Sequence, residues 1–260
     1  TRTTGISAGS GQPVSKTYID GKIELEPTPG DDATNEIGQS HTITATVYIT
    51  DDGSTWTAVS EDDAYVTLTI DPSSPTGTHF VPTGTTAEGY TDGNGRFSAD
   101  IVSDNPGVVR VNGSAVIYGY GSVTLDQSFT VNTGDPNSSD PAKKTYVDAK
   151  ISLSPPSATN AVGQEHEITA TVQVNDGSGW TDPSYGTITF SLTKNPTSMD
   201  AAIDPVSDSP SSGTLIGTLN SNDPGTVTIS ATYAVTVGGV DLTRTTGISA
   251  GSGQPVSKTY

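Results

Sequence analysis

The chain contains no cysteine, so a disulfide framework and a thiolate metal site are both excluded. Aromatic residues make up only 6% of the sequence and hydrophobic residues 31%, whereas glycine occurs 29 times and proline 17 times among the 260 residues. A single large hydrophobic core needs more apolar side chains than this. The composition therefore favours several small β domains.

Positive charge is also scarce, because 11 Lys and Arg residues stand against 29 Asp and Glu residues, which gives a net charge of −18. An acidic surface repels nucleic acid and anionic lipid, so neither is expected as a partner. No apolar run approaches the roughly 18 residues that span a bilayer. We expect no membrane insertion in this segment and no leader peptide, as for an internal window of a longer protein.

The first eighteen residues, TRTTGISAGSGQPVSKTY, return unchanged as residues 243–260. The first positions differ by 243 − 1 = 242, so the chain holds one period of 242 residues and an overlap of 260 − 242 = 18. A fold tolerates most surface substitutions and would let two copies diverge. Recent duplication, or an engineered overlap, explains the identity better. We interpret the chain as a window of a tandem array.

A weaker repeat lies inside this period. KTYIDGKIEL, which begins at Lys16, matches KTYVDAKISL, which begins at Lys144, and ATNEIGQSHTITATV at residues 33–47 matches ATNAVGQEHEITATV at residues 158–172. Each copy then reaches an Asp-Gly turn and a tryptophan, Trp56 or Trp180. The period therefore contains two related domains, and each is expected to bury its tryptophan between two sheets.

The local pattern is strand after strand. Ile43, Ala45, Val47 and Ile49 alternate with threonine and tyrosine, which is the period of two that buries one face of a strand. No stretch of ten or more residues has helical periodicity. Turn pairs separate the runs, among them Asp52-Gly53, Asn94-Gly95, Asn112-Gly113 and Gly238-Gly239. The sequence predicts an all-β chain of two tandem immunoglobulin-like β-sandwich domains joined by short Pro/Gly/Ser linkers.

Two stretches carry a family resemblance: SATNAVGQEHEITATVQVNDGSGW at residues 157–180 and TDGNGRFSADIVSDNPGVVRVNG at residues 91–113. They resemble the bacterial immunoglobulin-like (Big) domains of intimin- and invasin-type surface proteins and of giant prokaryotic adhesins. The second domain departs from the pattern, with SDSPSSGTLIGTL in place of the Asp92–Gly95 turn. The resemblance implies a spacer or adhesive module on a cell surface, and it implies nothing about a ligand.

The repeats predict the following boundaries. Residues 1–17 form the last strand and linker of the preceding repeat, 18–132 the first domain, 133–145 a linker, 146–249 the second domain and 250–260 a linker into the next repeat. The prolines in the linkers limit bending, so we expect semi-rigid beads.

The first seven residues form the predicted self-assembly segment. As the final strand of the preceding domain, they are expected to pair with a neighbouring copy, either through covalent continuity or by strand addition in trans. Both arrangements are head-to-tail, and such a contact grows into a filament. The segment consists of Thr1, Arg2, Thr3, Thr4, Gly5, Ile6 and Ser7.

The segment Gly5–Gly9, repeated at Gly247–Gly251, spells GxSxG. A hydrolase elbow requires a helix after the serine, whereas Ser-Gly-Gln-Pro follows here, so we expect no enzyme. His41 and His166 occupy matching positions at the starts of strands, where a rim histidine bonded to the backbone is expected.

One candidate calcium site lies at the first linker, although solvated acidic loops explain the same residues. Its oxygen ligands would be Asp135, Asn137, Asp140 and Asp148. The second linker has no acid between Ala250 and Ser257, so calcium cannot serve every joint. No other cofactor is expected. Asn112 and Asn137 are N-glycosylation sequons, which matter only in an organism that has the machinery.

Together these features predict a structural or adhesive repeat unit of an extracellular, cell-surface fibre or stalk, whose partners are neighbouring copies of itself. Three alternatives stay open: a module that binds a surface glycan or protein through tyrosines such as Tyr118 and Tyr120, an S-layer or sheath component, and a non-catalytic spacer of a secreted enzyme.

Overall fold

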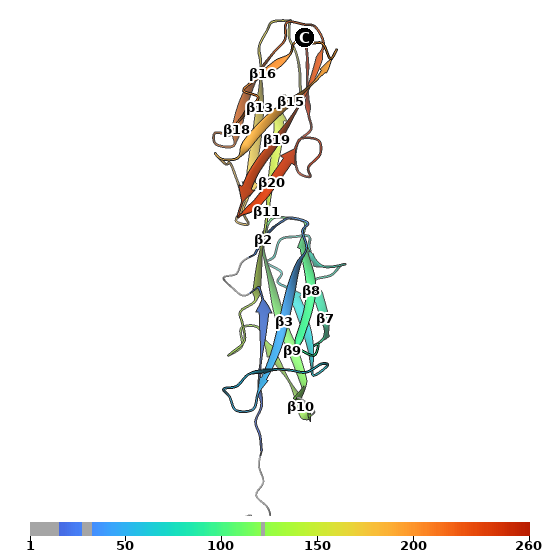
Figure 1. Ribbon diagram of the computed structural model, residues 1–260, viewed down its shortest axis with the longest axis vertical. Coiled ribbons are helices and arrows are strands. Elements are labelled where there is room, and N and C mark those ends of the chain that lie inside the picture. The colour runs from blue at the N-terminus through green and yellow to red at the C-terminus, as the bar shows by residue number, and fades with distance from the viewer. Residues whose placement is uncertain (1–15, 28–32, 121–122) are drawn as a thin grey trace, which may run out of the picture.

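The structure is a computed structural model that describes residues 16–27, 33–120 and 123–260. Every element of regular structure in these ranges is a β-strand. The strands form two sandwiches that lie end to end along the long axis of the molecule (Figure 1). The predicted fold class, all-β with two tandem immunoglobulin-like sandwiches, is confirmed. Within the described ranges, no helix is long and apolar enough to span a bilayer.

The first domain is built from one sheet of order β1-β3-β8-β6, with β4 on β3, and a facing sheet in which β9 pairs with β5, β10 and β11, β5 with β7 and β11 with β2. Its strands are β1 Asp20–Glu26, β2 Thr34–Glu36, β3 His41–Thr50, β4 Thr57–Ala58, β5 Ala64–Ile70, β6 Thr78–Phe80, β7 Thr86–Tyr90, β8 Arg96–Ser103, β9 Gly107–Tyr120, β10 Val123–Asn132 and the first part of β11 Ala142–Ser154.

In the second domain, one sheet has the order β16-β18-β13-β11, formed with the rest of β11, and β14 also pairs with β13. The facing sheet has the order β12-β21-β19-β15-β17, and β20 also pairs with β19. The further strands of this domain are β12 Ser157–Thr159, β13 His166–Asn175, β14 Trp180–Thr181, β15 Thr187–Asn195, β16 Ala202–Asp204, β17 Ser207–Asp208, β18 Thr214–Asn220, β19 Thr226–Val237, β20 Val240–Thr245 and β21 Val256–Thr259.

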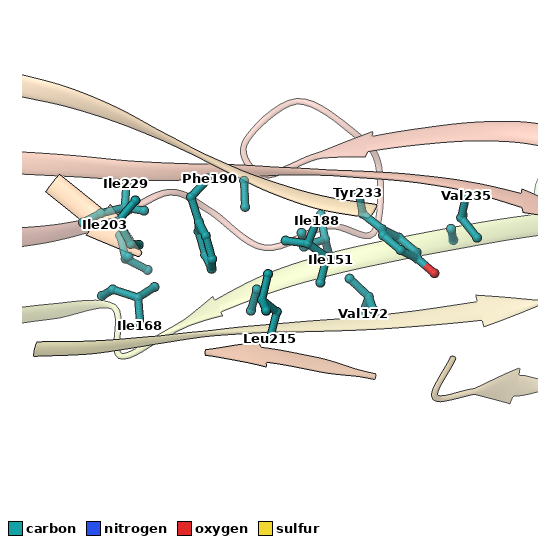
Figure 2. Packing of buried hydrophobic residues seen from close by; sticks show 14 of the residues in the cluster. Ile151, Ile168, Val172, Ile188, Phe190, Ile203, Leu215, Ile229, Tyr233 and Val235 are labelled. Carbon is teal, nitrogen blue, oxygen red and sulfur yellow. The ribbon is translucent and has the colours of Figure 1, made fainter. Parts of the chain in front are cut away.

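Alternation along the strands builds a separate core in each domain. Ile43, Ala45 and Val47 on β3 are fully buried, as the period of two predicts. In the second domain, Phe190 and Tyr233 from one sheet meet aliphatic side chains from the other (Figure 2). The cores change over within a single strand, since Tyr146 belongs to the first and the next residue, Val147, to the second.

The expectation that each domain buries its tryptophan is wrong. Trp180 is 39% exposed and Trp56 is half-buried. Each ring lies beside an outward-facing lysine from the strand on the other side of β13 or β3, with Lys150 Nζ 4.1 Å from the Trp180 ring centroid and Lys22 Nζ 5.0 Å from that of Trp56. The tryptophans therefore act in cation–π contacts on the surface, and aliphatic, Phe and Tyr side chains fill the cores.

Two predicted boundaries are also wrong. Residues 142–145 of the expected linker 133–145 belong to β11, which pairs with β9 and completes the first domain. In the expected linker 250–260, residues 256–259 form β21, which pairs with β19 inside the second domain. The Gly, Ser and Pro residues ahead of both strands suggested linkers, but they form loops that return the chain to its own sheet.

Candidate functional site: the joint between the domains

The two domains share strand β11. From Ala142 to Tyr146 it is antiparallel to β9, and from Thr145 to Val147 it is parallel to β2, both in the first domain. From Asp148 onward it is antiparallel to β13 of the second domain. The chain thus passes from one sandwich to the next without a free linker. The orientation of the second domain is therefore set by the direction of a hydrogen-bonded strand.

Arg244 on β20 bridges the two domains across this strand. Its Nη2 and Nε atoms donate to Asp148 Oδ1 at 2.6 and 3.0 Å, and Nε also donates to the Ala149 carbonyl at 3.0 Å. Nη1 lies 2.8 Å from Glu36 Oε1 in the first domain. The Arg244 side chain is only 8% exposed and that of Asp148 9%. A buried guanidinium is tolerated when its donors are paired in this way.

The repeated KTY motif fixes the same joint from the side of the first domain. Tyr146 is fully buried and donates from its hydroxyl to the Ile101 carbonyl at 2.9 Å. Lys144 is also buried, and its Nζ donates to Asn35 Oδ1 at 2.8 Å. Burial lowers the pKa of Lys144 to about 8 and raises the pKa of Tyr146. Ile37 N–H donates to the Val147 carbonyl at 3.1 Å.

The motif returns at the far end of the second domain. Lys258 lies on β21, which pairs with β19 and runs parallel to β12, and Tyr260 donates from its hydroxyl to the Leu219 carbonyl at 3.0 Å. Lys258 is fully buried, its Nζ has no hydrogen-bond partner among the described residues, and burial lowers its pKa. The second domain thus ends as the first one does, with a KTY strand in place.

The predicted self-assembly residues Thr1, Arg2, Thr3, Thr4, Gly5, Ile6 and Ser7 lie outside the described residues. Their identical copy, residues 243–249, contains the end of β20 and the turn after it. The expectation that this segment is the final strand of its domain is therefore wrong, because its copy in the second domain is followed by a further strand, β21. Tyr18, the counterpart of Tyr260, is 79% exposed.

Matching hydrogen bonds inside the two domains show which residues of one correspond to which residues of the other. Thr133 pairs with Gly113 through its N–H and its Oγ1, and Thr246 pairs with Ala231 in the same two ways. Two residues before each threonine, the first domain has the buried Val131 where the second has Arg244. In the internal repeat, Ala161 of the second domain corresponds to Glu36 of the first, and Asp20 of the first domain corresponds to Asp148 of the second. The ion-paired bridge is thus specific to the joint within one period.

The predicted calcium ligands are not brought together. Asp135 Oδ2 accepts hydrogen bonds from the backbone and side-chain nitrogens of Asn132, at 2.7 and 3.1 Å, while Asp148 is bound to Arg244. Asn137 and Asp140 are exposed loop residues. No group of three or more His, Cys, Asp or Glu side chains in the described ranges could hold a metal ion. The structure does not assemble the predicted site at Asp135, Asn137, Asp140 and Asp148.

Three further predicted positions have ordinary structural surroundings. Ser249, the serine of the GxSxG sequence, lies in a turn and accepts a hydrogen bond from Thr245 N–H at 2.9 Å, with the extended segment before β21 after it. Of the sequons, Asn137 is exposed in a loop, whereas Asn112 lies half-buried on β9 with its amide directed at Asp71. Only Asn137 has the exposure that a glycan attachment requires.

His41 and His166 are matched rim residues, and Nε2 of each is buried without a partner among the described residues. This differs from the backbone-bonded ring that was expected. The pKa of each ring is lowered, first by burial and then by the charge of Lys144 beside His41 and of Lys258 beside His166.

The pairing of Arg244 with Glu36 and Asp148 was not predicted from the sequence. A signal was present, because Arg244 follows Leu242 by two residues on an alternating strand and both side chains point inward. A charged residue at an inward position requires a buried partner, but the sequence does not show which acid supplies it.

The chain is similar to several solved bacterial adhesin structures. It matches the D0-D1 domains of intimin at 20% identity, over 93% of this chain and 100% of that one, with a TM-score of 0.29. It matches the D00-D0 domains of intimin at 16% identity, over 92% and 100%, with a TM-score of 0.44. Invasin, titled a bacterial integrin-binding protein, matches at 16% identity over 87% of this chain and 38% of its own, with a TM-score of 0.29.

These three structures are of the intimin and invasin type that the sequence motifs indicated. No protein-family model and no curated protein matches the chain.

Proposed function

We propose that this chain is the repeat unit of an extracellular fibre or stalk on a cell surface, in which copies follow one another head to tail and present an adhesive surface. One observation carries the proposal. The KTY strand that joins the two domains as β11 occurs again as β21 and Tyr260, at the far end of the second domain. In an array, the next first domain would continue from Tyr260 as the second domain continues from Tyr146.

The continuation is defined by sequence identity. Residues 256–260 are identical to residues 14–18, and residue 18 leads into β1 as Tyr146 leads into the second part of β11. Joined in this way, β21 and β1 would form one strand shared by two copies. Each copy would then be held to the next by main-chain hydrogen bonds on both sides of the joint.

The array would contain two kinds of joint. The joint within a period has the Glu36–Arg244–Asp148 bridge, whereas the joint between periods has Ala161, Val131 and Asp20 at the matched positions. The proposed fibre is therefore a series of stiff two-domain rods connected by joints that keep the shared strand but lack the guanidinium.

The test is a two-period chain, in which residues 1–260 are followed directly by a second copy of residues 19–260. Electron micrographs should show four sandwiches in one line, with the second period continuing the axis of the first. Folding back, or side-by-side association of the two periods, would reject the linear array. Lateral contacts that extend in two dimensions would support an S-layer or sheath.

Strand addition in trans is tested by a chain that lacks residues 243–260. Its second domain has lost β21 and Arg244, and residues 1–18 of another copy carry the identical sequence. If copies exchange strands, this chain should form filaments. The filaments should disappear when residues 1–18 are also deleted, and a synthetic peptide of residues 1–18 should stop their growth by occupying the open sheet edge. A monomeric product that the peptide does not bind would leave covalent continuity as the way in which copies join.

The adhesive part of the proposal concerns a protein target. Invasin is a bacterial integrin-binding protein, and for the present chain we propose only the class of partner, a protein on an opposing surface. Tandem sandwiches would carry a binding face away from the anchoring surface, and each added copy would extend the reach by one period.

A further inference from the structure

Three tyrosines form one face on the outside of the first domain. Tyr65 on β5 is the direct cross-strand partner of Tyr90 on β7 and of Val116 on β9. The rings of Tyr65 and Tyr90 lie edge to face, with centroids 4.9 Å apart. Tyr118, two residues beyond Val116, points to the same side. Tyr90 is 54% exposed and Tyr118 40%, so the rings lie open to solvent.

Acidic residues border this tyrosine face. Glu88 is exposed on β7, two residues before Tyr90 and therefore on the same side of the strand. The run Glu61-Asp62-Asp63 leads into β5, and the Asp63 carbonyl accepts a hydrogen bond from Tyr118 N–H at 2.8 Å. Desolvation, and after it the charge of Glu88, raises the pKa of Tyr65, as expected for a phenol beside a carboxylate.

Several other surface aromatic rings of this protein are covered by its own lysines. Lys22 Nζ lies 4.9 Å from the Tyr48 ring centroid, and Lys150 lies over Trp180. In the described part of the chain, no lysine or arginine lies over the three rings of the tyrosine face. The face thus combines π-electron density and carboxylates, the two features that attract a cation, without a cation of its own.

The second domain lacks this face. Aligned on Gly113 and Ala231, the positions of Tyr65, Val116 and Tyr118 are taken by Thr187, Ala234 and Thr236. Thr187 and Ala234 are direct cross-strand partners, as Tyr65 and Val116 are. The sandwich therefore forms without aromatic side chains at these three positions, and the tyrosines are not a requirement of the fold.

In the proposed array, the elements of the first domain that would contact the preceding copy do not include the three tyrosines. Where the second domain meets the first, the contacts come from Arg244 and from the turns at Gly177 and Gly238. The counterparts of these elements in the first domain are Val131, the turn at Gly53 and the β9–β10 hairpin. Tyr118 lies two residues before the end of β9, whereas β9 pairs with β11 near the second domain through its first residues.

We propose that the tyrosine face (Tyr65, Tyr90 and Tyr118, bordered by Glu88 and residues 61–63) binds exposed arginine and lysine side chains of a partner protein. Arginine fits best, since its planar guanidinium stacks on an aromatic ring and also donates to a carboxylate. The net charge of −18 favours the approach of a basic partner. This inference specifies the chemistry of the protein target in the proposed function, and it does not depend on the array.

The test uses the full chain and an arginine-rich peptide, with a peptide that carries neutral citrulline in place of every arginine as its control. Backbone amide signals followed by NMR should shift on β5, β7 and β9 of the first domain and not at the matched strands of the second. The double variant Tyr65→Thr/Tyr118→Thr keeps the charge of −18 and introduces the residues that the second domain has at these positions. We expect about tenfold weaker binding, since each exposed cation–π contact contributes modestly.

A matched pair of charge variants separates the face from general acidity. Glu88→Gln should weaken binding of the peptide, whereas Glu165→Gln, an equal loss of charge on the exposed surface of the second domain, should not. Unchanged affinity in the folded double tyrosine variant would overturn the proposal, as would equal binding of the citrulline peptide. Shifts of the same signals with a neutral oligosaccharide, but not with the peptide, would reassign the face to a glycan.

Discussion

Arg244 Nη2 and Asp148 Oδ1 are 2.6 Å apart, although the two residues are separated by 96 positions in the sequence. Their contact joins β20 of the second domain to β11, the strand along which the chain passes from the first domain to the second. Glu36 extends the contact into the first domain through its own ion pair with Arg244. One side chain therefore links the end of the second domain, its first strand and the preceding domain.

Replacement of this arginine should destabilise the second domain strongly. Arg244→Val introduces the residue that occupies the matched position, Val131, in the first domain. It leaves the Asp148 carboxylate buried without its guanidinium, and the loss of one partner of a buried ion pair lowers the free energy of unfolding by about 3–5 kcal/mol. Denaturant unfolding followed at Trp180 measures the effect.

Glu36→Gln is the matched control for that variant. The Glu36 side chain is 33% exposed, and exposed ion pairs contribute about 1 kcal/mol or less. A loss on Glu36→Gln as large as that on Arg244→Val would contradict the assignment of the main role to the Arg244–Asp148 pair.

The two kinds of joint should differ in stiffness. In micrographs of the two-period chain, we expect a narrower distribution of bend angles at joints within a period than at the joint between periods. Arg244→Val should broaden the first distribution. Installing Glu at Ala161 and Arg at Val131 should narrow the second, because Asp20 is already in place to accept the guanidinium. Indistinguishable distributions in the unmodified chain would refute the difference.

The buried tyrosine hydroxyl at the joint offers a small but specific test. Tyr146→Phe removes the buried hydrogen bond to the Ile101 carbonyl, so the free energy of unfolding of the first domain should fall by about 1 kcal/mol. Tyr18→Phe, the same substitution at the exposed counterpart, should change nothing measurable in the 260-residue chain. Thermal unfolding of both variants makes the comparison. Equal effects would mean that the hydroxyl at residue 146 is not bonded as described.

Stability should rise with pH in the alkaline range. Burial holds the pKa of Lys144 at about 8, below its unfolded value of 10.5, so between these two values the unfolded chain binds the additional proton. The free energy of unfolding of the first domain should therefore increase from about pH 8 toward pH 10, before tyrosines of the unfolded chain ionise. Lys144→Met should remove this rise, and denaturant midpoints across the range would show whether it does.

The matched histidines His41 and His166 should affect stability at acidic pH. The pKa values of His41 and His166 are lowered in the folded state, so the unfolded chain takes up protons first as the pH falls below its value of about 6.5. Stability should decline below that pH. His41→Gln/His166→Gln should reduce the decline, and an unchanged acid profile in this double variant would assign it to other groups.

Much of the fold could be predicted from local pattern, because alternation along β3 and the matching ATN and KTY motifs depend only on neighbouring residues. The boundaries could not be predicted, because both loops before β11 and β21 are rich in Gly, Ser and Pro. Whether such a loop leaves a domain or returns to it depends on pairing with β9 or β19, far away in the sequence.

The site was predicted less well than the fold. Trp56 and Trp180 were expected inside because large aromatic residues usually are, but an outward lysine from another strand of the same sheet gives each ring a contact at the surface. Asp148 was expected to bind calcium, and its actual partner is a cation 96 residues later. Such partners are determined by tertiary contacts, which no local pattern contains.

The shared strand also determines how the molecule would bear a tensile load. A pull on Asp20 and on β11 acts along the strand direction, whereas the hydrogen bonds of β1 to β3 and of β11 to β9 lie across it. All the bonds of a strand are then strained together in shear and cannot unzip one at a time. Under flow, each sandwich would therefore resist extension with whole strands, and a tether built from such units would hold until an entire strand slides.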